Sequence, residues 1–198
     1  MSLQLDIEKY FALSEFKPKE KSLAMAAFKE LVKLLNRGEV RSAEKQNGSW
    51  IANSWVKKGI LLGFRLGKNK NMSIYKQMLF FDKDTIPIKP MTVGDSVRIV
   101  PGGSSIRTGA YIAKGVICMP PMYVNIGAYV DENTLIDSHA LVGSCAQLGK
   151  RIHLSAAAQI GGVLEPVNSV PVIIEDEVMI GGNSGIYEGT IVQKRAVI

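Results

Sequence analysis

The chain has 198 residues, 46% of them hydrophobic, which is enough to bury the core of one or two domains. Its net charge of +6 comes with basic pairs such as Lys57-Lys58 and Lys150-Arg151 but no long basic run, so we expect a solvated surface or the steering of small polyanions, and no nucleic-acid partner. No apolar run reaches the roughly 18 residues of a membrane span, and two cysteines fit a reduced, cytoplasmic protein better than a disulfide framework.

Residues 1–95 predict a small α+β unit. A first helix is expected over about Leu3 to Leu13, and a second where Leu23, Ala27, Leu31, Val32 and Leu35 recur at helical spacing, with Gly38 as its C-cap. From Trp50 to Phe81, short apolar runs broken by Gly and Asn indicate a few strands. Three proline-containing points mark the passage into the rest of the chain: Pro87, Pro90 and Pro101-Gly102-Gly103.

Residues 96–198 are organised by an aliphatic residue that returns at every sixth position. A period of six is neither helical nor a simple strand alternation, so each unit must be one strand and one corner, which predicts a parallel β-helix of about five coils. Only Cys118 departs from Ile, Val or Leu at the repeated positions, which are Ile106, Ile112, Cys118, Val124, Val130, Ile136, Val142, Leu148, Leu154, Ile160, Ile174, Ile180, Ile186, Val192 and Ile198.

Two irregularities qualify the repeat. The gap from Ile160 to Ile174 is fourteen residues, two more than two hexads, so we expect residues 162–168 to bulge from a corner as a loop. The chain stops at Ile198, an inward position that leaves an uncapped edge, so we expect the natural protein to continue.

Small residues two positions before each aliphatic residue, such as Ala128 and Ala140, should also point inward.

Several blocks of sequence resemble one known family more specifically than the hexads do. Ser-Cys-Ala-Gln at 144–147, Gly-Val-Leu-Glu-Pro at 162–166 and the segment 123–131 resemble the bacterial tetrahydrodipicolinate N-succinyltransferases, as do Ala-Glu-Lys at 43–45 and Trp-Val-Lys-Lys at 55–58. The resemblance covers nearly the whole chain. It implies a left-handed parallel β-helix after the small α+β domain.

The resemblance also implies an activity. The expected reaction is transfer of a succinyl group from succinyl-coenzyme A to the amine of ring-opened tetrahydrodipicolinate, 2-amino-6-oxopimelate, in the diaminopimelate and lysine pathway. Succinyl-coenzyme A would be a co-substrate, with no permanently bound cofactor and no metal. Members of the family are homotrimers whose active sites lie between neighbouring prisms.

Three charged residues match positions of the family. Asp137, in Ile136-Asp137-Ser138-His139, would bind, orient or deprotonate the substrate amine; the alternative is an ordinary surface carboxylate. Arg98 would pair with a substrate carboxylate or remain solvated. Glu165, in the expected loop, would hold the substrate amine or stabilise the loop.

Small residues point to the coenzyme. One coil has three hexads, or eighteen residues, so residues eighteen apart should stack on successive coils. When two inserted residues are subtracted after Ile160, this spacing stacks Gly143, Gly161 and Gly181 on one face, and Ser144, Gly162 and Gly182 beside them. Exposed backbone in such a stripe suits a pantetheine arm, although hexads favour glycine there in any case. Candidate coenzyme-binding residues are therefore Ser144, Gly161, Gly162, Gly181 and Gly182, while Lys114, Lys150 and Arg151 are basic residues that nothing in the spacing distinguishes.

Departures from the family keep other functions open. Gly185 stands where a second acidic residue is usual, Asn183 replaces an arginine, and His139 replaces a tryptophan; Glu188 lies near the first of these. An acetyl-coenzyme A-dependent transferase and an inert trimeric homologue are the alternatives. A trimeric metal hydratase is disfavoured because it needs three histidines and the chain has only His139 and His153. Cys145 is expected to pack or line the site rather than to act as a nucleophile. His139 is expected to have a structural or lining role, with general-base catalysis, as in some left-handed β-helix acetyltransferases, as the alternative.

Overall fold

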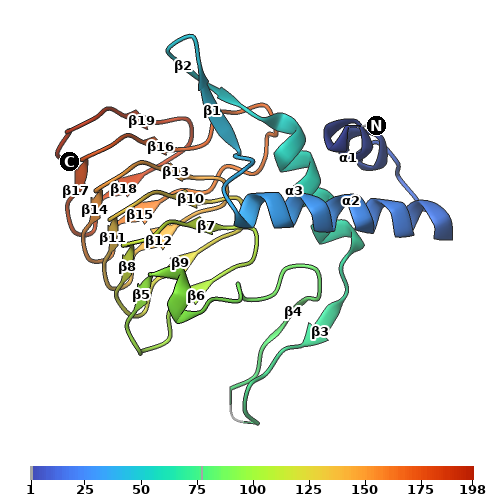
Figure 1. Cartoon of the computed structure of the whole chain (residues 1–198), viewed down its shortest axis with the longest axis horizontal. Helices are drawn as coiled ribbons and strands as arrows, with labels where there is room; N and C mark the ends of the chain where they lie inside the picture. The colour runs from blue at the N-terminus through green and yellow to red at the C-terminus, as the bar shows by residue number, and fades with distance from the viewer. Residues whose placement is uncertain (1, 77) are drawn as a thin grey trace.

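The computed structural model describes residues 2–76 and 78–198, which form a helical unit beside a stack of β coils (Figure 1). In this part of the chain the N-terminal unit has three α-helices, two antiparallel hairpins and a short 3-10 turn, so the predicted α+β unit is confirmed. Its elements are α1 (Leu3–Phe11), α2 (Pro18–Asn36), β1 (Ala43–Gln46), β2 (Ser49–Ala52), α3 (Ser54–Leu66), β3 (Asn69–Asn71), β4 (Phe81–Lys83) and η1 (Val93–Asp95).

The second helix ends as predicted. Gly38 adopts a left-handed φ of 70°, and its amide donates to the carbonyl of Leu35 at 3.0 Å. Glycine takes this conformation without the steric cost of a Cβ, which explains why the helix stops there.

The prediction of a few strands from Trp50 to Phe81 is confirmed by β2, β3 and β4 but missed helix α3, which lies between β2 and β3. Gly59 and Gly63 suggested breaks, but they lie one turn apart on the buried side of α3. A Cβ on Gly59 would meet the side chain of Leu31, and one on Gly63 would meet the ring of Phe28, both from α2. These glycines therefore allow two helices to approach closely, and this tertiary packing overrides their low helix propensity.

The second half is a parallel β-helix with three faces, and each coil contributes one strand to each face. Strand pairing between successive coils is parallel and in register, as in Tyr129 opposite Gln147. The predicted β-helix is thus confirmed. Among the described residues, face I contains β5 (Arg98–Ile99), β8 (Ile117–Cys118), β11 (Leu135–Ile136), β14 (His153–Leu154) and β17 (Met179–Ile180); face II contains β6 (Ser105–Ile106), β9 (Tyr123–Val124), β12 (Leu141–Val142), β15 (Gln159–Ile160) and β18 (Gly185–Ile186); face III contains β7 (Tyr111–Ile112), β10 (Tyr129–Val130), β13 (Gln147–Leu148), β16 (Ile173–Ile174) and β19 (Ile191–Val192).

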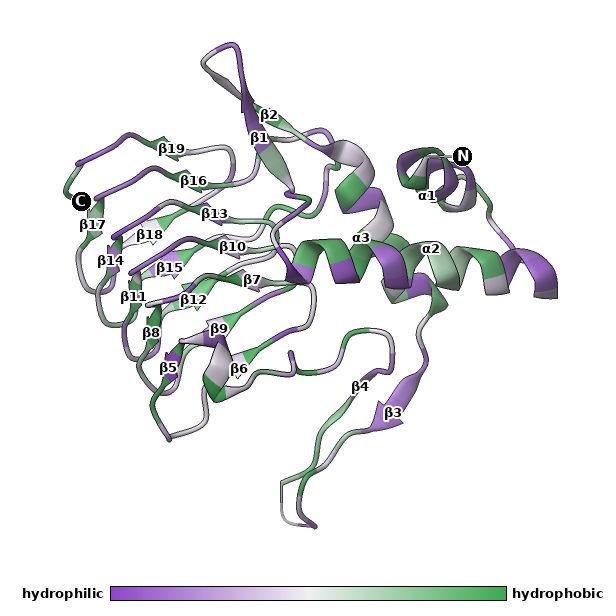
Figure 2. Cartoon of the chain, viewed as in Figure 1, coloured by the Kyte–Doolittle hydropathy of each residue, from purple (hydrophilic) through white to green (hydrophobic). Residues whose placement is uncertain are grey.

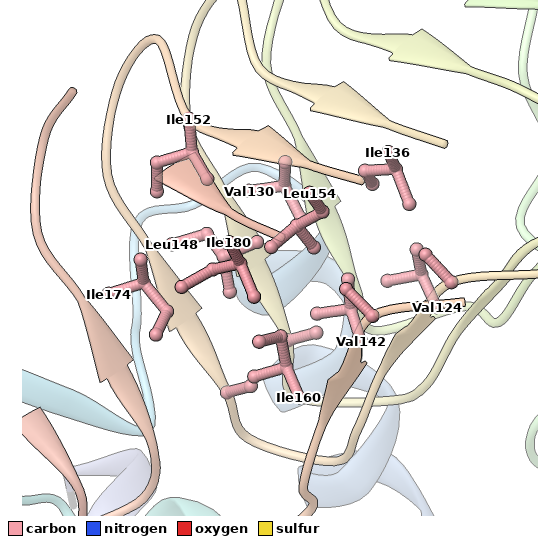
Figure 3. Packing of buried hydrophobic residues seen from close by; sticks show 14 of the residues in the cluster. Val124, Val130, Ile136, Val142, Leu148, Ile152, Leu154, Ile160, Ile174 and Ile180 are labelled. Carbon is pink, nitrogen blue, oxygen red and sulfur yellow. The ribbon is translucent and has the colours of Figure 1, made fainter. Parts of the chain in front are cut away.

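The inside of the solenoid is filled by the predicted hexad residues (Figure 3). Val124, Val130, Ile136, Val142 and Leu148 are fully buried and point toward one another. The residue two positions before each also faces inward, which is why small residues such as the alanines at 128, 140 and 146 are needed at the narrow corners. Ile198 is the exception, because it lies at the edge of the last coil and is 52% exposed.

Most corners turn through a left-handed residue placed three after the inward residue, the exceptions being Pro121 after Cys118 and Val163 after Ile160. This conformation favours glycine, and among other residues asparagine, because a Cβ is costly there. The following residues have positive φ at the corners: Gly109, Gly115, Gly127, Asn133, His139, Cys145, Arg151, Ala157, Glu177, Asn183, Gly189 and Arg195.

The insertion is larger than the sequence spacing suggested. Equivalent residues are 18 apart between Tyr129 and Gln147, but 26 apart between Gln147 and Ile173, so the extra segment has eight residues. The chain passes from face II directly to face III, with residues 161–172 as a loop and not as a further hexad plus two residues. Pro166 stands at the sixth position after Ile160, and proline cannot donate the amide that a strand of the ladder requires.

The helical unit packs against the side of the solenoid and has its own core. Ile126 and Cys145, from corner residues of the solenoid, belong to this core and join the two parts. Hydropathy colouring shows hydrophobic segments along the helices and coils, whereas the β1–β2 hairpin is hydrophilic toward its tip (Figure 2). Within residues 2–76 and 78–198, we find no helix with the length and apolar character that crossing a bilayer requires.

Candidate functional site

Asp137 lies at the corner between faces I and II, named corner I/II, which comprises residues 137–140, 155–158 and 181–184. It follows β11 directly and is half-buried. Its Oδ1 accepts a hydrogen bond from the amide of Ser138 at 2.7 Å, and among the described residues Oδ2 accepts none. Asn125 and Asp131 make the same bond with the next amide at 2.8 Å, so one oxygen of Asp137 shapes the turn and the other is left available for a further hydrogen bond.

Arg98 is exposed on face I, in the first coil. It pairs with Ile117, which pairs with Leu135, so Arg98 lies two coils away from the strand that precedes Asp137. At about 4.8 Å per coil this is roughly 10 Å along the axis. The backbone of Arg98 thus lies on the same face as the strand that leads into Asp137, two coils away along the axis.

Ser144, Gly161 and Gly162 meet at the corner between faces II and III, named corner II/III, which comprises residues 125–128, 143–146, 187–190 and the loop 161–172. A Cβ on Gly162 would lie 2.6 Å from the amide nitrogen of Ser144. A side chain on Gly143 would likewise collide with the backbone of Gly161 and Gly162. Only glycine permits this approach, so packing between coils accounts for part of the glycine pattern.

Gly181 and Gly182 do not belong to this group, and the predicted stripe was wrong in that respect. Because the insertion has eight residues and not two, Gly181 follows β17 on corner I/II. It therefore lies above Ser155 and Asp137, two coils and roughly 10 Å from the carboxylate. The candidate residues consequently occupy two corners that flank face II.

Glu165 lies apart from both groups. It is exposed in the loop 161–172 and lines a hollow of about 420 Å³ with Phe11, Leu61, Phe64 and Arg65 of the helical unit. Within one chain the structure does not bring Glu165 next to Asp137 or Arg98.

Tyr187 is the residue at corner II/III that the spacing argument missed. With the correct register it stacks above Gly143 and Gly161, and Glu188 stacks above Ser144 and Gly162. The ring of Tyr187 lies 3.0 Å from the Cβ that Gly161 lacks and 2.5 Å from the one that Gly185 lacks. Gly185 is thus not simply a lost acidic residue, since its missing side chain makes room for an aromatic ring. The signal was Pro166, which shows that no strand occupies the hexad after Ile160.

The basic candidates Lys114, Lys150 and Arg151 lie on the remaining corner, corner III/I, which comprises residues 113–116, 131–134, 149–152, 175–178 and 193–196. Lys114 and Lys150 lie 3.6 and 3.3 Å from Glu132, and Arg151 lies 2.6 Å from Glu177. These ion pairs form a ladder across the coils, away from the two corners that flank face II. Their positions favour a role in holding coils together.

A hollow of about 270 Å³ lies beneath the β1–β2 hairpin, over face III. The guanidinium of Arg41 stacks 3.6 Å above the ring of Tyr129 and donates to Gln147 at 2.9 Å. Glu175 accepts from Lys45 at 2.9 Å and from Trp50 at 3.0 Å. Since these groups satisfy one another, the hollow is explained by attachment of the hairpin to the solenoid.

The structure agrees with a packing role for Cys145. Its side chain is fully buried, and burial raises the pKa of its thiol to about 11, so it is protonated near neutral pH and is a poor nucleophile. His139 is exposed at corner I/II with a left-handed backbone, two residues from Asp137.

Corner I/II offers a partly exposed carboxylate with one oxygen that accepts no hydrogen bond among the described residues, and corner II/III offers glycine backbone without side chains. A carboxylate can accept a proton from an ammonium ion, and a groove of exposed backbone can hold an extended chain. Together with the three-sided coil of hexads, these features define the class of hexapeptide-repeat β-helix proteins.

The comparisons with known proteins narrow that class. Residues 2–66 match the family described as "Tetrahydrodipicolinate N-succinyltransferase N-terminal". The chain is 39% identical to a 2,3,4,5-tetrahydropyridine-2,6-dicarboxylate N-succinyltransferase of Dechloromonas aromatica over an alignment of 201 residues. The alignment covers 99% of this chain and 73% of the relative. The chain therefore belongs to the tetrahydropyridine-2,6-dicarboxylate N-succinyltransferase family.

Other relatives are more similar over a shorter span. Proteins of the same name from Sodalis glossinidius and Acinetobacter baylyi are 46% and 48% identical over 178 and 176 residues. In each case the match covers 87% of this chain, which spans only 63% of the relative.

Proposed function

We propose that the protein transfers a succinyl group from succinyl-coenzyme A to the amine of 2-amino-6-oxopimelate, the ring-opened form of tetrahydrodipicolinate, in diaminopimelate and lysine biosynthesis. The observation that carries this proposal is identity of 39% over 99% of the chain to a relative named for that transfer. The partly exposed carboxylate of Asp137 at corner I/II supports it, because only one of its oxygens is engaged by a backbone amide among the described residues and the reaction needs a proton acceptor for the ammonium group.

In the proposed reaction the thioester is already activated, so positioning and proton transfer suffice. Asp137 takes a proton from the substrate ammonium, the amine nitrogen attacks the thioester carbonyl, and a C–N bond forms. The tetrahedral intermediate then breaks its C–S bond and its nitrogen loses a second proton. One of the two protons goes to the departing sulfur, so the coenzyme leaves as a thiol, and the other is released from Asp137 to solvent. Arg98 pairs with a substrate carboxylate, and Glu165 contacts the substrate amine.

The acyl donor is proposed to lie along face II. Ser144, Gly161 and Gly162 would line the pantetheine arm from corner II/III, and Gly181 and Gly182 would approach it from corner I/II. The bound donor leaves the protein after each turnover, so succinyl-coenzyme A is a co-substrate and not a permanent cofactor. The proposed ligands of the protein are therefore a dicarboxylate substrate and a coenzyme A thioester.

We also propose a homotrimer in which a neighbouring prism completes each site. Supporting this, Glu165 lies by the helical unit and not beside Asp137, so its proposed contact with substrate requires a second copy. Multi-angle light scattering tests the assembly, with the mass of three chains expected and a monomer contradicting it.

The two buried free thiols, Cys118 and Cys145, support a reducing location such as the cytoplasm.

The decisive experiment mixes the protein with succinyl-coenzyme A and tetrahydrodipicolinate and measures both free thiol and product mass. We expect thiol release that depends on both substrates and a product heavier by one succinyl group. Acetyl-coenzyme A in place of the succinyl donor is the matched comparison. Preference for the acetyl donor would replace the proposal with an acetyltransferase, and absence of turnover with either donor would indicate an inert homologue.

A further inference from the structure

Lys57 is a fully buried lysine in the first turn of α3. Its Nζ donates to the backbone carbonyl of Ser169 at 2.5 Å, across 112 residues of sequence. In the described part of the chain, the other buried polar residues are uncharged: Ser42, Thr108, Thr134 and Gln147. No Asp or Glu lies within ion-pair distance of Lys57 among residues 2–76 and 78–198.

Ser169 closes a turn in the loop 161–172, since its amide donates to the carbonyl of Pro166 at 3.1 Å. The same loop is held at its start by Val163, which is buried in the solenoid core and whose amide donates to Ser144 at 3.0 Å. Leu164 packs against the core of the helical unit. The loop is therefore fastened to both parts of the molecule, and Lys57 provides its polar attachment to the helices.

Burying an ammonium group without an opposite charge is unfavourable, and burial lowers the pKa of Lys57 accordingly. An apolar side chain of similar length would fill the same space at lower cost. Stability alone thus does not explain a lysine at this position. What lysine adds is a directed bond that fixes where the turn of the loop lies relative to α3.

We propose that Lys57 is a positioning residue that holds the loop 161–172 so that Gly161 and Gly162 line the acyl donor. This inference rests on the function proposed above. Lys57 itself does not touch the substrates, because its side chain has no exposed surface. It acts through the backbone of the loop, which also carries Glu165.

The test compares Lys57→Met with Lys58→Met. Lys58 is the next residue of α3, is partly exposed and forms a 3.6 Å ion pair with Glu8, so it controls for loss of a positive charge on the same helix. For each variant the measurements are Tm, kcat, KM for each substrate, and hydrogen exchange of the loop amides. Lys57→Gln is a second variant in case the methionine protein does not fold.

For Lys57→Met we expect an unchanged or higher Tm, faster exchange confined to residues 161–170, and a KM for succinyl-coenzyme A raised by about tenfold. Lys58→Met should show neither change in exchange nor change in KM. A lower Tm with unaltered KM and unaltered loop exchange would overturn the proposal, because Lys57 would then be merely structural.

Failure of the proposed function has a different signature. If the wild-type protein transfers no succinyl group, the kinetic arm is uninformative about the loop, and hydrogen exchange decides alone. Faster exchange limited to the loop in Lys57→Met would still support positioning by Lys57. Unchanged exchange would reject it whatever the activity.

Discussion

The solenoid and the helical unit are stabilised in different ways. In the solenoid, every coil repeats the same contacts, so each inward residue packs on equivalents from the coils above and below. In the helical unit, each contact occurs once, as where Gly63 of α3 meets Phe28 of α2. Periodic sequence therefore determines periodic structure locally, whereas single contacts depend on residues far apart in the chain.

The largest expected effect is in the solenoid core. Leu148→Ala removes a fully buried side chain that close-packed coils cannot readily replace, so we expect a loss of about 2–5 kcal/mol in the free energy of unfolding. Urea denaturation measures it. Leu141→Ala, at an outward and half-buried position of face II, is the control and should cost clearly less. Equal losses would mean that the coils do not pack as described.

A smaller loss is expected in the helical unit. In Gly63→Val the added side chain would overlap the buried ring of Phe28 and push α3 from α2, at a cost of about 1–3 kcal/mol partly offset by better helix propensity. The control is Gly94→Val, where the nearest atom to the new Cβ is 3.4 Å away. Thermal unfolding of both variants decides, and an unaffected Gly63→Val would show that the helices tolerate separation.

The smallest effect is on the surface ladder of corner III/I, and it depends on pH. The guanidinium groups of Arg195 and Arg151, each 2.6 Å away, lower the pKa of Glu177 to about 2 from the ordinary 4.5. Because the folded-state pKa is depressed, its stabilisation is complete above pH 4.5 and is lost as the pH falls toward 2.

Glu177→Gln tests this ladder. The Tm difference from wild type should be largest near pH 7, should shrink as the pH falls from 4.5 through 2, and should vanish well below pH 2, where both proteins carry a neutral side chain at this position. Glu30→Gln, which removes one exposed 3.6 Å pair with Lys33, should show a smaller difference. A pH-independent difference for Glu177→Gln would rule out the ion pairs as its cause.

The same contrast explains what sequence could predict. Hexad residues such as Val124 and Ile180 were predictable because six-residue spacing reports burial directly. Helix α3 was missed because Gly59 and Gly63 fit there only through α2. Gly181 and Gly182 were assigned to the wrong corner because spacing alone did not show that Pro166 lies in a loop. The contact of the buried Lys57 is with Ser169, which is 112 residues away in the sequence. Unique contacts of this kind leave no local pattern.

The proposed proton acceptor at corner I/II is Asp137. The most direct test of its role compares the rates of succinyl transfer by Asp137→Asn and Asp131→Asn. Both substitutions keep the side-chain oxygen that accepts the next amide, at 2.7 and 2.8 Å in the native protein, so both should leave the fold intact. We predict that kcat falls by about 100-fold or more in Asp137→Asn and stays near the native value in Asp131→Asn. Equal turnover in the two variants would contradict the assignment.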